Sequence, residues 1–64
     1  MKIFDAIFLK VHNRYFNNAY ISTIRKSYRI GIGPIIEIFL HEVLPKELEQ
    51  ELTSISKPFP IFFY

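Results

Sequence analysis

Cysteine and tryptophan are absent from this 64-residue chain, which also has only one methionine, two glycines and two histidines. Without cysteine there can be no disulfide and no thiolate metal site, and two histidines do not supply the ligands of a structural zinc ion. A chain this short buries only about 60% of its unfolded surface, so a dense apolar core must stabilise it. Ile, Leu, Val and Phe supply 25 of the 64 residues, which excludes a disordered tail.

Long apolar runs are also missing. The longest stretch without a charge, Tyr15 to Ile24, has ten residues and includes two asparagines, a serine and a threonine. A membrane-spanning helix needs about 20 apolar residues. Asp5 interrupts the apolar N-terminal run and no small-residue cleavage site follows it. We therefore expect no membrane span and a cytoplasmic location.

Charge is distributed unevenly, although the net charge is only +2. Residues 1–31 carry a balance of +5, whereas residues 32–64 carry a balance of −3. This asymmetry favours a basic side that faces a polyanion and a solvated acidic side. The alternative is that two exposed faces simply differ in sign.

The first segment, residues 3–15, is predicted to be an amphipathic helix. Apolar side chains recur there at helical spacing, at Phe4, Ile7, Phe8, Val11 and Tyr15. Alternation between residues 3 and 9 also permits a strand. Asn17 and Asn18 then indicate a turn.

Two further helices are expected over residues 22–28 and 34–44. Ser22 can cap the first of them, in which Ile24 and Tyr28 would be buried. Gly31 and Gly33 indicate a turn, and Pro34 suits the first turn of the next helix. Pro45 predicts a break, followed by a charged helix over residues 46–54. The proline-rich aromatic tail, residues 56–64, suits an edge strand or an extended arm.

These elements define the expected fold. Two short helices joined by a glycine-containing turn form a helix-turn-helix outline. With a helix before it and an extended tail after it, the chain is predicted to be mainly α, a single winged-helix-like domain over residues 1–64.

The stretch Ser22-Thr23-Ile24-Arg25-Lys26-Ser27-Tyr28-Arg29-Ile30-Gly31 resembles the gamma domain of FtsK-type DNA translocases. That family carries Ser, a spacer, Leu, and then Gln-Arg-Arg-Phe-Arg-Ile-Gly. Ser56-Lys57-Pro58, followed by Ile61-Phe62, is similar to the family's wing. The resemblance implies a winged helix that binds DNA and contacts a recombinase.

The chain departs from the family after Gly31. The family's next helix opens with Tyr-Asn-Arg and carries a further Arg, and these polar residues face the DNA. Here the corresponding positions are Ile32-Gly33-Pro34 and Glu37. The family's motor domain is absent from this chain, so ATP-driven translocation does not transfer to it.

The leading hypothesis is therefore binding of double-stranded DNA, mainly through its phosphates. The candidate residues are Ser22, Arg25, Lys26, Arg29 and Lys57, because arginine and lysine suit phosphate contacts and a helix N-terminus binds anions. The alternative for Arg25, Lys26 and Arg29 is a solvated basic face.

A second hypothesis is an accessory or inhibitor protein that binds a protein partner, or a second copy of itself. Its surface would be the Ile-rich segment 34–44 and the aromatic tail, with Phe59, Phe62, Phe63 and Tyr64. The tail could instead cover the chain's own core. No nucleophile–base pair is recognisable, so we expect no enzyme, no catalytic residue, no metal and no cofactor.

Overall fold

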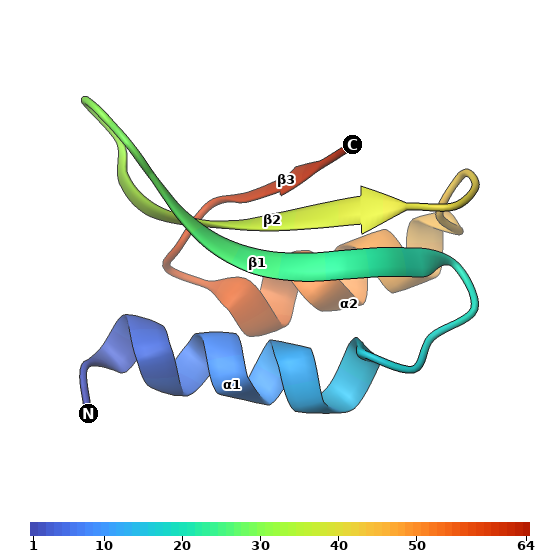
Figure 1. The fold of residues 1–64 in the computed structure, drawn as a ribbon, viewed down its shortest axis with the longest axis horizontal. Coiled ribbons are helices and arrows are strands. Elements are labelled where there is room, and N and C mark those ends of the chain that lie inside the picture. The colour runs from blue at the N-terminus through green and yellow to red at the C-terminus, as the bar shows by residue number, and fades with distance from the viewer.

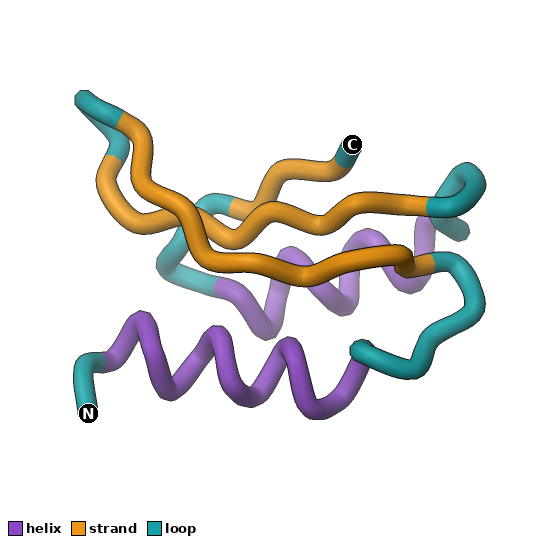
Figure 2. Tube along the Cα trace, in the orientation of Figure 1, coloured by secondary structure: helices purple, strands orange, loops and turns teal.

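The computed structural model describes residues 1–64 and contains two helices and three strands (Figure 1). In chain order these are α1 (Ile3–Tyr15), β1 (Ile21–Arg29), β2 (Gly33–Leu40), α2 (Lys46–Ser56) and β3 (Ile61–Phe63). The three strands form one layer and both helices lie side by side on the same face of it (Figures 1 and 2). The opposite face of the sheet has no helix over it.

The sheet has the order β1-β2-β3. β1 and β2 form an antiparallel hairpin in which Arg25 pairs with Glu37. β3 runs parallel to β2 and pairs Phe63 with Ile38. Because parallel neighbours require a crossover, α2 carries the chain from the end of β2 back to the start of β3.

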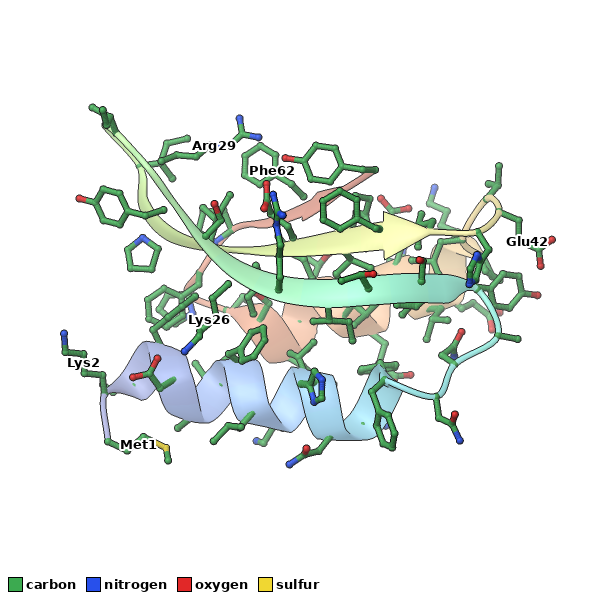
Figure 3. The ribbon with its side chains drawn as sticks, viewed as in Figure 1. Met1, Lys2, Lys26, Arg29, Glu42 and Phe62 are labelled. Carbon is green, nitrogen blue, oxygen red and sulfur yellow. The ribbon has the colours of Figure 1, made fainter.

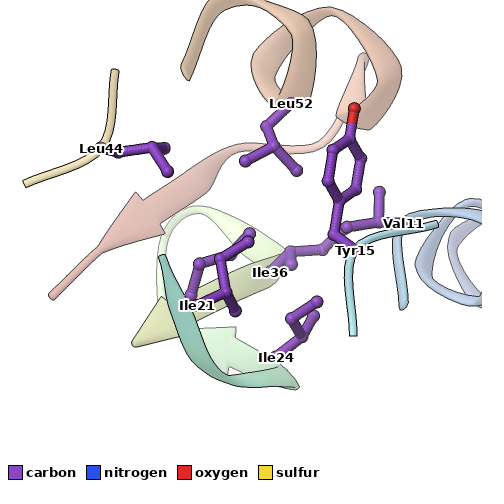
Figure 4. Packing of buried hydrophobic residues seen from close by; sticks show 8 residues of the cluster. Val11, Tyr15, Ile21, Ile24, Ile36, Leu44 and Leu52 are labelled. Carbon is purple, nitrogen blue, oxygen red and sulfur yellow. The ribbon is translucent and has the colours of Figure 1, made fainter. Parts of the chain in front are cut away.

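The apolar core lies between the sheet and the two helices (Figure 4). Val11 of α1, Leu52 of α2, and Ile36 and Ile38 of β2 are fully buried. Ile21 and Ile24 of β1, Tyr15 of α1 and Leu44 complete the buried cluster. Burial of this apolar surface is the main source of stability for a chain of this size.

The predicted mainly α, winged helix-turn-helix fold is wrong. The segments 22–28 and 34–44, expected as helices, are instead the hairpin strands β1 and β2, so the protein is a small α+β domain. In β2 the deciding factor is the β-branched series Ile35, Ile36 and Ile38, because such side chains are stiff and pack well on a pleated surface. Pro34 is the second residue of this strand and does not begin a helix; it lies before the part of β2 that pairs with β3, so proline is tolerated there.

A bulge lies near the start of β1. Ile21 pairs with Leu40 and Thr23 with Phe39, so one extra residue, Ser22, is accommodated in β1. Ile21 and Ile24, three residues apart, are therefore both buried, whereas Tyr28, predicted to be buried with Ile24, is 69% exposed. Without the bulge, residues three apart on a strand would point to opposite faces.

The two glycines form the turn of the hairpin. Gly31 has φ +87° and Gly33 has φ +104°, values that L side chains rarely adopt. The backbone N–H of Ile32 donates to the carbonyl of Arg29 at 3.0 Å across this turn. The glycine pair was expected to separate two helices and instead joins two strands.

The outer parts of the chain follow the sequence-based expectations. The helix predicted over residues 3–15 is α1, the charged helix predicted over residues 46–54 is α2, and the tail contributes the edge strand β3. Asn18 lies in the predicted turn, where its side chain accepts a hydrogen bond from the Tyr20 N–H at 2.9 Å. Neither helix has both the length and the apolar character that crossing a bilayer requires.

Candidate functional site: the open face of the sheet

The face of the sheet opposite the helices, called here the open face, carries the chemistry of the molecule. Alternation along the strands directs to it the side chains of Thr23, Arg25, Ser27, Arg29, Ile35, Glu37, Phe39, Phe62 and Tyr64. Two arginines, one carboxylate and three aromatic rings are thus brought onto one three-stranded surface.

Glu37 is at the centre of this surface and is only 7% exposed. Arg25 Nε donates to its Oε1 at 2.7 Å, and the Tyr64 hydroxyl donates to its Oε2 at 3.0 Å. The Arg25 hydrogen bond holds the pKa of the Glu37 carboxyl below its ordinary value; burial opposes this shift and the Tyr64 hydrogen bond adds to it. Glu37 is therefore ionised at neutral pH and offsets one of the two arginine charges.

The two arginines lie over aromatic rings. The Arg25 Cζ atom is 5.0 Å from the centroid of Phe39, and the Arg29 Cζ atom is 4.2 Å from the centroid of Phe62. Figure 3 shows Arg29 and Phe62 next to each other. Guanidinium groups are attracted to ring faces at such distances. Both arginines are therefore held on the sheet with their charge at its surface.

Tyr64 links the two arginines. Its hydroxyl accepts a hydrogen bond from Arg29 Nη2 while donating to Glu37, and its ring stacks on Phe39 with centroids 5.0 Å apart. Tyr64 as a whole residue is 47% exposed. Arg25, Glu37, Tyr64 and Arg29 thus form one continuous polar row.

The predicted DNA-binding residues do not come together as one cluster. Arg25 and Arg29 share the open face, but Lys26 points to the helix side, where its Nζ lies 3.5 Å from Asp5 and 5.5 Å from the Phe8 centroid (Figure 3). On a helix the three cations would be neighbours, whereas a strand alternates them between its faces.

Ser22 and Lys57 are separate from this surface. Ser22 is the exposed residue at the bulge of β1 and does not cap a helix; its Oγ lies 3.5 Å from Thr23 Oγ1. Lys57 is exposed just after α2, before the chain turns into β3. The predicted wing, from which Lys57 would reach phosphate, is not present.

The aromatic tail is divided between the two faces of the sheet. Phe59 packs edge-to-face on Phe4 with centroids 5.0 Å apart, and Phe63 packs against the core. Only Phe62 and Tyr64 reach the open face. The Ile-rich helix of the second hypothesis is wrong, because that segment contains the central strand β2. The four tail aromatics lie on two faces and not on one.

A second polar group joins the two helices. The Tyr15 hydroxyl donates to Glu51 of α2, and Arg14 Nη2 lies 2.8 Å from the same carboxylate. Burial and the neighbouring Glu51 raise the pKa of Tyr15 to about 12. Glu51 lies in the helix that was predicted only as a charged segment, and no sequence pattern connects residues 36 positions apart.

The role of Glu37 was also missed. The sequence suggested that it would face a DNA groove, whereas it is an ion-pair partner at the centre of the sheet. A signal for this was available, because one charged residue between Ile36 and Ile38 follows the two-residue period of a strand.

No protein-family model matches this chain, and no curated protein or solved structure is significantly similar to it. The comparisons thus provide no link to the gamma domain of FtsK-type translocases.

Proposed function

We propose that the protein binds single-stranded nucleic acid on the open face of its sheet. The observation that carries the proposal is the pairing of Arg25 with Phe39 and of Arg29 with Phe62 on a face that no helix covers. Guanidinium groups contact phosphates, and aromatic rings and guanidinium planes stack with unpaired bases.

A single strand fits this surface better than a duplex does. Duplex recognition in the major groove uses a protruding helix or a two-stranded ribbon, whereas a flat sheet with aromatic side chains suits splayed bases. The segment predicted as a recognition helix is β2, the central strand of the sheet. The predicted binding of double-stranded DNA required a recognition helix, and this segment does not form one.

The proposed roles follow from the positions of the side chains. Arg25 and Arg29 lie four residues, or about 13 Å, apart on one strand and would hold two phosphates that are not adjacent. Tyr64, a residue that is 47% exposed, would stack its ring with a base. Glu37 keeps Arg25 oriented and limits the net charge of the surface. Because the ligand contacts are phosphates and ring faces, we expect little sequence preference.

The test is a fluorescence-anisotropy titration of a labelled single strand of about 12 nucleotides and of its duplex, at two salt concentrations. Two cations on a single strand predict a slope of log affinity against log salt of about −1.4. Arg29→Gln should flatten the slope by about 0.7. Lys10→Gln is the matched control, since Lys10 is exposed on α1, on the other side of the sheet.

Stacking is tested separately with two variants of one residue. Tyr64→Ala should weaken binding by about 1–3 kcal/mol, whereas Tyr64→Phe keeps the ring and should retain most of the affinity. Tighter binding to the duplex, equal effects of Arg29→Gln and Lys10→Gln, or no binding to the single strand at low salt would each overturn the proposal.

A further inference from the structure

The tip of the β1–β2 hairpin exposes large apolar side chains. Ile30 is 97% exposed, Tyr28 is 69% exposed and Ile32 is 54% exposed. The positive φ values of the turn are supplied by Gly31 and Gly33, so the turn itself does not require isoleucine. The core does not use these side chains either, because none of the three packs against the buried cluster. Neighbouring exposed apolar residues of this kind mark an interaction site, whereas isolated ones are normal.

The hairpin tip and the start of α1 lie at the same end of the molecule. Figures 1 and 2 show the β1–β2 turn extending away from both helices, with the beginning of α1 at the same end of the long axis. Ile3, the first residue of α1, is 71% exposed there. The tip and Ile3 are thus two separate apolar projections. A flat partner that lies across this end can meet both, whereas a narrow pocket can take only one.

Cations gather at the same end. Lys26 Nζ lies 3.5 Å from Asp5, and Phe59 packs on Phe4, so β1, the start of α1 and the connection from α2 to β3 meet here. These segments and the hairpin carry four positive side chains against the one carboxylate of Asp5, at Lys2, Lys26, Arg29 and Lys57. Of the four, only Lys26 is in an ion pair. We call this part of the molecule the basic end.

The opposite end is acidic. There β2 ends and α2 begins, and the end of α1 contacts α2 through Arg14 and Glu51, 2.8 Å apart. These segments carry four carboxylates against the two cations Arg14 and Lys46, at Glu42, Glu47, Glu49 and Glu51. Figure 3 shows Glu42 at this end and Lys2 at the other. The molecule is therefore polarised along its long axis, and a negatively charged surface would attract the end that carries the apolar projections.

The basic end is better matched to a lipid surface than to a second copy. Two-fold contacts use the same patch on both copies, so such a contact would bring four cations against four, and like charges repel. A bilayer with anionic headgroups offers a flat negative surface above an apolar interior. Its headgroups complement the cations, and its interior accepts the projecting isoleucines. A nucleic acid has the negative charge but no apolar phase for Ile30.

We propose that the basic end binds the surface of an anionic lipid bilayer, with Ile30 and Ile32 inserted below the headgroups. Tyr28 would lie at headgroup level, where amphipathic aromatic rings are favoured. Insertion is shallow, because the backbone groups of the turn need water or headgroups as hydrogen-bond partners. The site is distinct from the proposed nucleic-acid site: Arg29 contributes to both, but the isoleucines belong to the lipid site alone.

The first test is co-sedimentation of the full chain with sucrose-loaded vesicles made of equal parts phosphatidylcholine and phosphatidylglycerol. Vesicles of phosphatidylcholine alone are the neutral control. Ile30→Ser should weaken binding to the anionic vesicles about three- to tenfold. Val43→Ser is the matched control, because Val43 is 89% exposed but follows β2 at the acidic end, and it should bind as the wild type does. No binding of the wild type, equal binding to both vesicles or equal effects of the two variants would overturn the proposal.

The role of the cations is tested at the two ends of α2. Lys57 follows its last residue at the basic end, and Lys46 is its first residue at the acidic end. Lys57→Gln should weaken binding to the anionic vesicles about fivefold, whereas Lys46→Gln should leave it unchanged. Equal losses would mean that only net charge matters, and would overturn the orientation that the proposal requires.

The inserted segment is located with tryptophan, which the chain lacks. With Ile30→Trp, anionic vesicles should shift the emission to shorter wavelength and brominated lipid should quench it; with Val43→Trp, neither should happen. Equal responses would overturn the proposal. Dimerisation of the lipid-free protein that Ile30→Ser abolishes would also overturn it, by assigning the tip to a second copy. Because Ile30 lies outside the open face, Ile30→Ser should bind the oligonucleotide as the wild type does, so the two proposals can fail separately.

Discussion

The two faces of the same sheet are built in different ways. The helix-covered face buries Ile36 and Ile38 among Val11 and Leu52 without a polar side chain between them. The open face buries one apolar side chain, Ile35, and a carboxylate, Glu37, which lies under an arginine and a tyrosine. Apolar contacts are non-directional and collectively large, whereas the contacts of the open face are directional and partly exposed to water. Folding therefore depends mainly on one face, and the other is available for recognition.

The largest expected effect is on the helix-covered face. Ile36→Ala should lower the free energy of unfolding by about 2–5 kcal/mol, because it leaves a cavity at a fully buried site. A loss of this size could unfold so small a domain. The matched control is Ile30→Ala, at a hairpin-tip residue that is 97% exposed. Urea denaturation measures the free energy of unfolding of both variants. Equal losses would contradict the idea that stability depends mainly on the helix-covered face.

The next effect depends on pH and on Tyr15. Its pKa is raised to about 12 in the folded protein, so the unfolded chain loses this proton first as the pH rises above 10. The stability that Tyr15 contributes is complete below pH 10 and is lost between pH 10 and 12, by up to about 1.4 kcal/mol per unit. Tyr15→Phe should lack this component. If the free energies of unfolding of the wild type and of Tyr15→Phe fell equally between pH 10 and 12, the prediction would be contradicted.

A smaller loss is expected on the open face. Phe39→Leu keeps an apolar side chain but removes the ring that stacks on Tyr64 and lies under Arg25. We expect a loss of about 1–2 kcal/mol in urea denaturation, from one aromatic pair and one cation–π contact. A loss as large as that of Ile36→Ala would show that the open face is a second core.

The smallest effect concerns the ionisation of Glu37. Because its folded pKa is lowered, the stability it contributes is present above the ordinary pKa and is lost as the pH falls through the folded value. Glu37→Gln should therefore show a weaker decline in melting temperature on acidification than the wild type shows. An identical decline would mean that the Arg25 contact does not persist in solution.

The sequence was most informative where apolar side chains recur at helical spacing over several turns. The stripe from Phe4 to Tyr15 predicted α1, and the charged segment after Pro45 predicted α2. The centre of the chain failed because a separation of four residues puts Ile24 and Tyr28 on one face of either a helix or a strand. Strand pairing also depends on distant partners, and β3 reaches β2 only through tertiary contacts.

The candidate site was predictable only in part. Arg25 and Arg29 were identified as a pair because residues four positions apart lie on one face of a helix and also on one face of a strand. Lys26 was grouped with them as a neighbour, which it would be on a helix and is not on a strand. The contacts among Glu37, Tyr64 and Arg29 could not be predicted. These residues are up to 35 positions apart in the chain, and only the pairing of the strands brings them together.

The bulge at Ser22 determines where β1 can lose a residue without changing which side chains face the helices. Ser22 is the one residue by which β1 exceeds its partner between the Ile21–Leu40 and Thr23–Phe39 pairs. Its removal would restore regular alternation, with Ile21 and Ile24 still facing the helices and Thr23 still facing away. Deletion of any residue from 25 to 28 would instead exchange the faces of all β1 residues on one side of the gap. Single-residue deletions along β1 should therefore be tolerated at Ser22 and damaging beyond it, so natural variation in the length of this strand is expected at that position.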